Sequence, residues 1–137
     1  MISTEIEQVN VWPSVRIVSA SVAKASNKFR TQCVKTFLDL IIMSILMKEP
    51  SHGYSLIARI HRHFLVLLSP GMIYPRLLSL EKEGSIEKKL SKNGRRKIYF
   101  LTSKGREKWK KMLFECKEIY RYLLSSYYIE EGVVSAV

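Results

Sequence analysis

Several basic side chains are placed in this sequence where they could bind a nucleic acid. Four of them gather around the dipeptide Asn93-Gly94: Lys92, Arg95, Arg96 and Lys97. Arg76 follows Pro75 in the segment SPGMIYPRLL, residues 69–78. Lysine and arginine neutralise phosphates, and arginine can also bind guanine O6 and N7 in a bidentate way. A basic cluster is more often a solvated surface, so its meaning depends on the elements that carry it.

The charge of the whole chain agrees with a phosphate-rich partner. Its 137 residues carry 23 Lys and Arg against 12 Asp and Glu, which gives a net charge of +11. Such an excess favours nucleic acid or an anionic membrane surface. The longest apolar run, residues 40–47, is far shorter than the roughly 18 residues of a membrane span. Charged residues and a proline interrupt the N-terminal segment, which excludes a secretory signal. We expect a cytoplasmic protein of one domain.

Apolar spacing predicts three helices in the first two thirds of the chain. The first has a broad apolar face from Phe37 to Leu46 and ends before Pro50. The second begins after Ser51, and its apolar positions are Tyr54, Ile57, Ile60 and Phe64. The third runs from Ser69 to about Glu83, with Gly84 as its C-terminal cap.

The N-terminal end of the third helix has features suited to binding a phosphate. Ser69 is a good N-cap, Pro70 suits the first turn, and Gly71 would let a phosphate approach the backbone. A regular helix that starts near Met72 would have Pro75 as its fourth residue, at the cost of about one backbone bond. Ile73, Leu77 and Leu80 are expected to face inward. The opposite, exposed face is expected to carry Met72, Arg76, Ser79 and Glu83.

After Gly84 the pattern predicts a hairpin and then a long helix. Asn93-Gly94 is typical of a hairpin turn, and Ile98 and Phe100 alternate with Tyr99 as in a half-buried strand. From Thr102 the period is helical again, with apolar residues spaced alternately by three and four. This apolar seam consists of Trp109, Met112, Cys116, Ile119, Leu123 and Tyr127. It is expected to pack against a second copy of the chain.

The order of these elements predicts a mainly α fold with a small β wing. We expect a winged helix-turn-helix over residues 31–101, a C-terminal dimerisation helix over 102–128 and a tail over 129–137. Residues 1–30 could be an arm or an extra packing segment, with a short strand around Pro13 and a weak helix after it.

Three segments carry a resemblance to a known family. FLDLIIMSILMKEPSHGYSLIARI, SPGMIYPRLLSLEKEGSI and GRRKIYFLTSKGREKW resemble the PadR family of winged-helix transcriptional regulators. The similarity covers about Phe37 to Trp109. It implies a homodimeric repressor whose C-terminal helix forms the dimer interface, and which often responds to phenolic acids or other small aromatic compounds. The single C-terminal helix is similar to the shorter branch of the family.

The resemblance also implies roles for single residues. Tyr74 matches a tyrosine that contacts phosphate at the recognition helix, and Gly53 and Tyr54 match an element expected to pack between helices. Met72 replaces a small polar residue and could instead contact a thymine methyl. Ser85 replaces an apolar residue, which is expected to loosen the start of the wing.

These observations predict a sequence-specific DNA-binding regulator that acts as a repressor. Its expected partners are a two-fold operator in double-stranded DNA and a second copy of the chain. The expected DNA-binding residues are Ser69, Gly71, Met72, Tyr74, Arg76, Ser79, Lys92, Arg95, Arg96 and Lys97. The alternative is an architectural protein that coats DNA without sequence preference, which the net charge would also suit.

Other chemistry has little support in the sequence. His61 and His63 point to different sides of a helix and lack a third ligand, so we expect no metal site. No catalytic constellation or cofactor motif is present, and an enzyme is not expected. Cys33 and Cys116 are expected to be buried free thiols. Trp109 could line a pocket for an aromatic effector, although a core tryptophan is the more common role.

Overall fold

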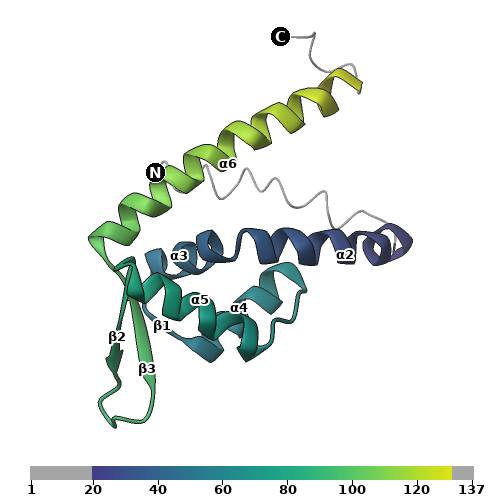
Figure 1. Ribbon diagram of the computed structural model, residues 1–137. Coiled ribbons are helices and arrows are strands. Elements are labelled where there is room, and N and C mark those ends of the chain that lie inside the picture. The colour runs from purple at the N-terminus through teal and green to yellow at the C-terminus, as the bar shows by residue number, and fades with distance from the viewer. Residues whose placement is uncertain (1–19, 131–137) are drawn as a thin grey trace.

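A computed structural model describes residues 20–130 of the chain, as a set of helices with a small antiparallel sheet (Figure 1). The elements follow the predicted order except for the short strand β1, which was not predicted. They are α2 (Ala20–Thr36), α3 (Leu38–Lys48), β1 (Ser51–His52), α4 (Gly53–Phe64), α5 (Pro70–Lys82), β2 (Ile86–Leu90), β3 (Lys97–Leu101) and α6 (Ser103–Glu130). The expected fold class, mainly helical with a β wing, is confirmed. The strand predicted around Pro13 lies outside the described residues.

The helix predicted from Phe37 is α3, and it is separated from the preceding helix α2 at Phe37. Phe37 has φ −92° and ψ 14°, and α3 begins at the next residue. The hydroxyl of Thr36 donates to the carbonyl of Gln32 at 2.9 Å, a local bond of the kind that bends helices. Backbone bonds continue on both sides, from Phe37 to Cys33 and from Ile41 to Phe37. The result is a bend between α2 and α3.

The core surrounds α3. Ile42 and Met43 on this helix are completely buried. Residues from α4, α5 and the connection between them pack around it: Leu56, Ile60, Val66, Leu68, Ile73, Leu77 and Leu80. Tyr54, an apolar position of the predicted second helix, lies outside this core and is 69% exposed. The buried stripe of α4 starts instead from Gly53 and continues through Leu56, Ile57 and Ile60, which leaves Tyr54 on the flank.

Both ends of α5 follow the prediction, with Ser69 at the N-cap and Pro70 as the first residue, but the regular helix does not start near Met72. Gly84 has φ +83°, its N–H donates to Glu81, and the N–H of Ser85 donates to Leu80, which is a Schellman cap. The helix begins at Pro70, so Pro75 is its sixth residue and lies inside the helix. The expectation that Pro75 occupies the fourth position is therefore wrong. Its ring leaves the carbonyl of Gly71 without the usual helical donor.

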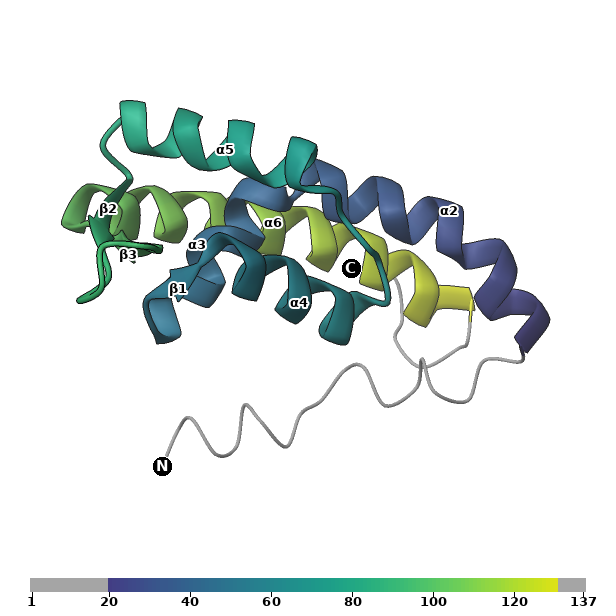
Figure 2. The same cartoon turned by 90° about the horizontal axis from the view of Figure 1, so that it is seen from below.

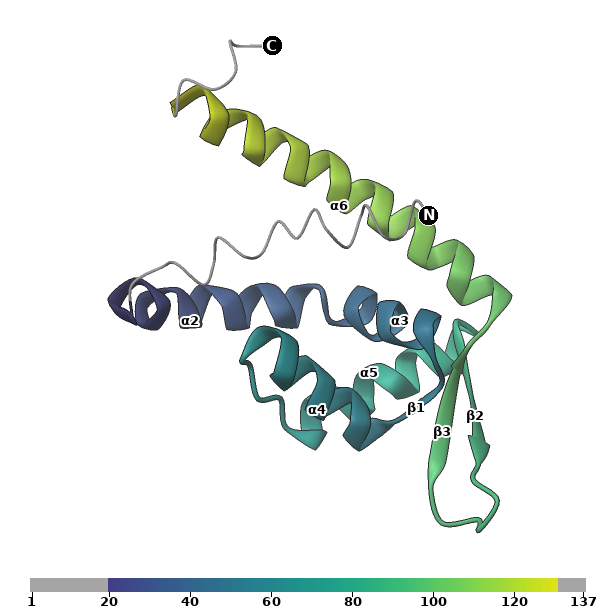
Figure 3. The same cartoon turned by 180° about the vertical axis from the view of Figure 1, so that it is seen from behind.

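The sheet has the order β1-β3-β2, with all neighbours antiparallel. Gly94 has φ +68° in the loop between β2 and β3, where the Asn93-Gly94 turn was predicted. On β3 it is Tyr99 that is buried, while Ile98 and Phe100 are half-buried on the other face. The two long strands project as a hairpin beyond the helical body (Figure 3), and this hairpin, residues 86–101, is called the wing below.

The long helix α6 lies on the other side of α3 from α4 and α5 (Figure 1), and in projection from below it crosses between α4 and α5 (Figure 2). Its first turns pack on α3, and its C-terminal part extends past the helical body (Figure 1). In the described part of the chain, no helix is long and apolar enough to cross a membrane.

Candidate nucleic-acid interface

A basic cleft of about 530 Å³ lies where the starts of α4 and α5 meet the wing. Its lining combines aromatic and cationic side chains with one glycine. The lining residues are His52, Gly53, Tyr54, Ser55, Tyr74, Arg95, Arg96, Lys97 and Tyr99. Residues far apart in the sequence, such as Tyr74 and Arg95, thus border one concave surface. A surface that is cationic and has hydrogen-bond donors is suited to phosphate groups.

Tyr74 is held in this cleft by its packing on Gly53. A Cβ atom placed on Gly53 would lie 2.6 Å from the Tyr74 hydroxyl oxygen and 2.8 Å from two ring carbons, so only glycine leaves room for the ring. The ring of Tyr54 meets that of Tyr74 edge-on, with centroids 6.1 Å apart. Gly53 therefore packs between helices as predicted. Tyr54 does so only through its contact with Tyr74, because most of its side chain is exposed.

The hydroxyl of Tyr74 is available as a donor. Partial burial and, secondarily, the neighbouring Tyr54 raise the pKa of Tyr74 above its ordinary value of 10.0. The phenol is therefore protonated at neutral pH. A protonated phenol can donate a hydrogen bond to a phosphate oxygen, and an ionised one could only repel it.

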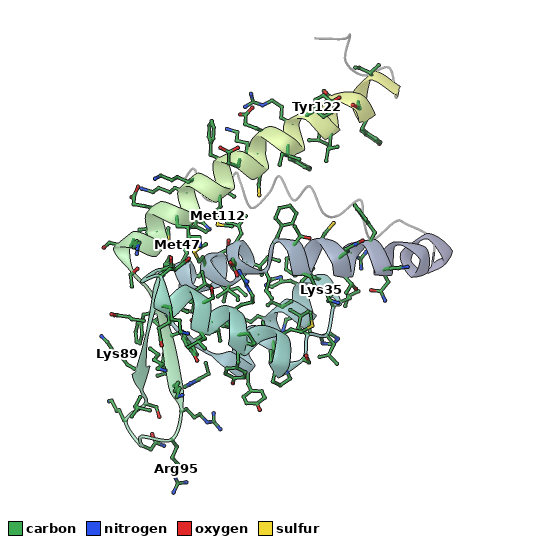
Figure 4. All side chains as sticks on the ribbon, in the orientation of Figure 1. Lys35, Met47, Lys89, Arg95, Met112 and Tyr122 are labelled. Atoms are coloured by element: carbon green, nitrogen blue, oxygen red, sulfur yellow. The ribbon has the colours of Figure 1, made fainter. Side chains whose placement is uncertain are left out.

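The wing carries the predicted cations at its tip. Lys92, Arg95, Arg96 and Lys97 are all exposed, and Figure 4 shows the side chain of Arg95 pointing away from the molecule. Within residues 20–130, none of these four side chains forms an ion pair with a carboxylate. Their charges are thus not neutralised inside the described part of the chain, and they remain available to an anionic partner.

The face of α5 that was expected to be exposed is exposed only in part: Arg76 and Ser79 are exposed, and Met72 and Glu83 are half-buried. Met72 is half-buried against the core. The Nε of Arg76 donates to Oδ1 of Asp39 at 2.7 Å, and its Nη2 bonds Oδ2 of the same carboxylate. Of this stripe only Ser79 is exposed without such a contact in the described residues. A guanine contact through the same two donors of Arg76 requires the ion pair with Asp39 to open.

Glu83, the fourth residue of that stripe, joins α5 to α6. Its Oε1 accepts hydrogen bonds from Nζ of Lys108 at 2.5 Å and from the Ser85 hydroxyl at 2.7 Å. The bond from Lys108 is the main cause that lowers the pKa of Glu83, followed by an opposing effect of burial and by the bond from Ser85. A carboxylate is unfavourable at the C-terminal end of a helix. The ammonium group of Lys108 offsets the negative charge of Glu83 there.

The start of the wing is firmly held, so the expectation that Ser85 loosens it is wrong. Ser85 is 1% exposed. Its carbonyl accepts bonds from the N–H of Thr102 at 3.1 Å and from the Thr102 hydroxyl at 3.0 Å. A Cβ atom on Gly105 would collide with this same carbonyl, so the start of α6 can lie this close to Ser85 only because residue 105 is glycine. A small polar residue fits here because both its hydroxyl and its carbonyl are bonded.

The N-terminal end of α5 carries the two remaining candidates. Ser69 has the extended backbone of an N-cap, and its carbonyl accepts from the N–H of Met72 at 3.0 Å. In the described residues its hydroxyl makes no capping bond, contrary to the role expected of a serine there. A Cβ on Gly71 would meet only the Ser69 hydroxyl oxygen, at 3.8 Å. Packing within the chain therefore does not require glycine at this position.

The comparisons with known proteins agree with this geometry. The family model described as "Transcriptional regulator PadR-like family" matches residues 42–111. This chain belongs to the PadR-like family. It is accordingly a DNA-binding transcriptional regulator with a winged helix-turn-helix fold. No curated protein matches the chain.

Solved structures support the same family. A PadR-like transcriptional regulator from Bacillus cereus is 33% identical, with a TM-score of 0.55, over 68% of this chain and 96% of that one. A PadR family regulator from Clostridium difficile is 27% identical, with a TM-score of 0.59, over 64% and 94%. A transcriptional regulator from Clostridium thermocellum, 23% identical over 77% and 94%, shares the fold with a TM-score of 0.60.

In this PadR-like chain the predicted seam of α6 divides into two parts. Trp109 and Met112 pack against the core of their own chain, and the indole N–H of Trp109 donates to the hydroxyl of Ser44 at 2.9 Å. Figure 4 shows Met112 where α6 crosses α3. These two residues therefore contact their own chain, and their contact with a second subunit stays a prediction. Ile119 and Leu123 further along are 58% and 59% exposed, and Tyr127 is also exposed.

Two smaller expectations concern histidines and cysteines. His61 and His63 are exposed on α4, and no group of three metal-ligating side chains occurs among the residues that the structure describes. Cys33 and Cys116 are free thiols as predicted, but both are half-buried and not fully buried.

Sequence reasoning missed the partners that hold α5 in this PadR-like regulator. Asp39 pairs with Arg76 across 37 positions, and Lys108 pairs with Glu83 across 25. In each pair the two residues are too far apart in the sequence for a local pattern to connect them. Only the crossing of α3, α5 and α6 brings them together.

Proposed function

We propose that this chain is a homodimeric repressor that recognises a specific operator sequence. The observation that supports this most is the cleft in which Tyr74 of α5 and three cations of the wing, Arg95, Arg96 and Lys97, border one surface. In this proposal α5 enters the major groove, and the wing lies over the adjacent backbone or minor groove.

The cleft and the helix end provide two kinds of phosphate contact. The Tyr74 hydroxyl donates to one phosphate oxygen, and the N-terminal end of α5 beside Ser69 and Gly71 favours another through the helix dipole. The wing cations neutralise further phosphates without reading sequence. Base reading is left to side chains on the outward face of α5, among which Ser79 is polar and exposed.

The dimer part of the proposal rests on α6. Beyond its contact with α3 this helix extends away from the body of its own chain and presents Ile119 and Leu123 to solvent. Two such apolar residues on one helix face are typical of an interface with a second copy. A two-fold dimer would place two copies of α5 in half-sites about one helical turn apart.

An aromatic effector is not part of this proposal. The Trp109 indole is packed on the core of its own chain and bonded to Ser44, which favours a structural role. An architectural, sequence-independent DNA-binding protein is the second candidate, favoured by the net charge of +11.

Selection from a random pool of double-stranded DNA separates the two candidates. A specific regulator enriches a two-fold sequence and binds it at least ~10³ times more tightly than random DNA at the same salt concentration. An architectural protein enriches no sequence. Transcription in vitro from a promoter that overlaps the selected site then tests repression, because a repressor lowers and an activator raises the amount of transcript.

A further inference from the structure

The outward face of the recognition helix α5 is less polar than that of a helix that reads bases by hydrogen bonds. Met72 is half-buried and Arg76 is engaged with Asp39. The exposed residues that remain after the first turn are Tyr74, Pro75, Leu78, Ser79 and Lys82. Tyr74 belongs to the cleft, and Lys82 is in the last turn, far from the helix N-terminus.

Leu78 is the large apolar side chain at the middle of this face. It is 48% exposed, although its neighbours Leu77 and Leu80 are almost completely buried. It follows Tyr74 by one helical turn and therefore lies next to it along the helix surface. A single exposed leucine is ordinary on a protein surface. This one lies between a phosphate-binding candidate and a lysine, on the face that the proposed function directs into the major groove.

We infer that Leu78 contacts the C5-methyl group of a thymine in each half-site. This inference rests on the proposed function, because it requires α5 to enter the major groove. Thymine is the one standard base that presents a methyl group there. Leucine offers neither a donor nor an acceptor, so opposite cytosine or a purine it would leave a base-edge polar group without a partner. A thymine methyl against Leu78 removes apolar surface of both from water.

The predicted recognition therefore differs from that expected of Arg76. An arginine that reads guanine selects a G·C pair, and a leucine that packs on a methyl group selects a thymine. The sequence pattern favoured Met72 for such a methyl contact. In the structure Met72 packs against the core, so Leu78 is the residue of α5 that is free to make it.

Replacement of thymine by uracil tests this directly. Uracil keeps the base pair and every hydrogen-bonding group of thymine, and lacks only the methyl. Each thymine of the operator selected from the random pool is replaced by deoxyuridine, one at a time, and the dissociation constant of the wild-type protein is measured. We expect one position in each half-site at which uracil weakens binding about fourfold, the factor that corresponds to one buried methyl-sized group.

Two variants assign the effect to its residue. In Leu78→Ala the uracil penalty at that position should disappear, because the methyl group no longer has a partner. In Ser79→Ala, which removes the neighbouring exposed side chain on the same helix, the penalty should remain about fourfold. A 5-methylcytosine paired with guanine at the same position should recover part of the affinity that an unmethylated cytosine loses.

Several outcomes would overturn the inference. One is an operator in which no thymine shows a uracil penalty; another is a penalty that persists unchanged in Leu78→Ala. Both would leave the proposed function intact, since the operator would still have been selected. A protein that enriches no sequence would overturn the proposed function and this inference together.

Discussion

Arg76 on α5 and Asp39 in the first turn of α3 form a two-bond ion pair, Nε to Oδ1 and Nη2 to Oδ2. The Asp39 side chain is largely buried, and that of Arg76 is 47% exposed. The pair connects the proposed recognition helix to the central helix of the core. It therefore positions α5, and the base-reading role that the sequence suggested for Arg76 competes with it.

Removal of either partner of this pair should weaken operator binding without a change in base preference. Arg76→Ala and Asp39→Ala should each lower the free energy of unfolding by about 1 kcal/mol, since the pair is partly exposed to solvent. The double variant should be little worse than either single one. Urea denaturation and binding to single-base operator variants measure both effects. If Arg76→Ala alone relaxed the preference at one base position, Arg76 would read that base.

Substitution of Gly53 tests whether the position of Tyr74 matters for DNA. In Gly53→Ala the new methyl group would lie 2.6 Å from the Tyr74 hydroxyl, so the exposed ring must move away. We expect operator affinity to fall roughly fivefold, the net value of one hydrogen bond of about 1 kcal/mol. In a Tyr74→Ala background the same change should cost no affinity, because the ring is gone. An equal loss in both backgrounds would contradict a phosphate contact by Tyr74.

The order of the elements could be predicted because it depends on local patterns. Helical spacing from Phe37 to Leu46, the Gly84 cap and the Asn93-Gly94 turn are features of neighbouring residues, and each is present in the structure. The junction of α2 and α3 at Phe37 was not predicted, because only a weak helix was expected before the apolar face that begins at Phe37. A hydroxyl bond from Thr36, which leaves no trace in the apolar pattern, accompanies the bend.

The orientation of α5 could not be predicted in the same way. Its buried residues Ile73, Leu77 and Leu80 were identified by their spacing. The remaining surface was then assumed to face solvent, but Met72 packs on the core, Arg76 bonds to Asp39 of α3 and Glu83 bonds to Lys108 of α6. Which flank is covered depends on where distant helices cross. Leu78 was consequently overlooked as a surface residue.

Stability should fall at acidic pH through Glu83. Its pKa lies below the ordinary value of 4.5, chiefly because of the bond from Lys108. A carboxyl group with a lowered folded-state pKa stabilises the fold above its unfolded pKa, and this contribution is lost as the pH falls through the folded value. The unfolding free energy of the wild type should therefore decline below about pH 4.5, and Glu83→Gln should lack that part of the decline. Urea denaturation across the acidic range, from neutral pH downwards, measures it.

The partner residue provides the control for this pH dependence. In Lys108→Met the main cause of the low pKa is absent, so the acid-dependent loss should shrink although Glu83 is retained. A wild-type pH profile in both Glu83→Gln and Lys108→Met would show that this ion pair does not contribute to acid sensitivity.

The wing cations should contribute affinity without specificity. Replacement of Arg95 and Arg96 by alanine should weaken binding to the operator and to random DNA by similar factors, because both bind phosphates or the minor groove. The slope of log K against log salt concentration should become shallower by roughly one for each phosphate that the variant no longer neutralises. Titrations at several salt concentrations measure this. Replacement of Lys111 and Lys117, exposed on α6, removes the same charge and should leave the slope almost unchanged.

The exposed part of the α6 seam should hold the dimer together. Leu123 is 59% exposed in the single chain, so a glutamate there is compatible with the fold of one subunit. In a dimer both carboxylates would be buried, at a cost of roughly 3 kcal/mol per subunit and so about 6 kcal/mol per dimer, which corresponds to association weaker by more than about ten-thousandfold. Wild-type protein should sediment at twice the 15.9 kDa of one chain, and Leu123→Glu should sediment as a monomer or aggregate. Tyr122→Glu introduces the same charge at the neighbouring position, which points to a different side of the helix, and should remain dimeric. A Leu123→Glu protein that is folded and fully dimeric would place the interface elsewhere on the chain.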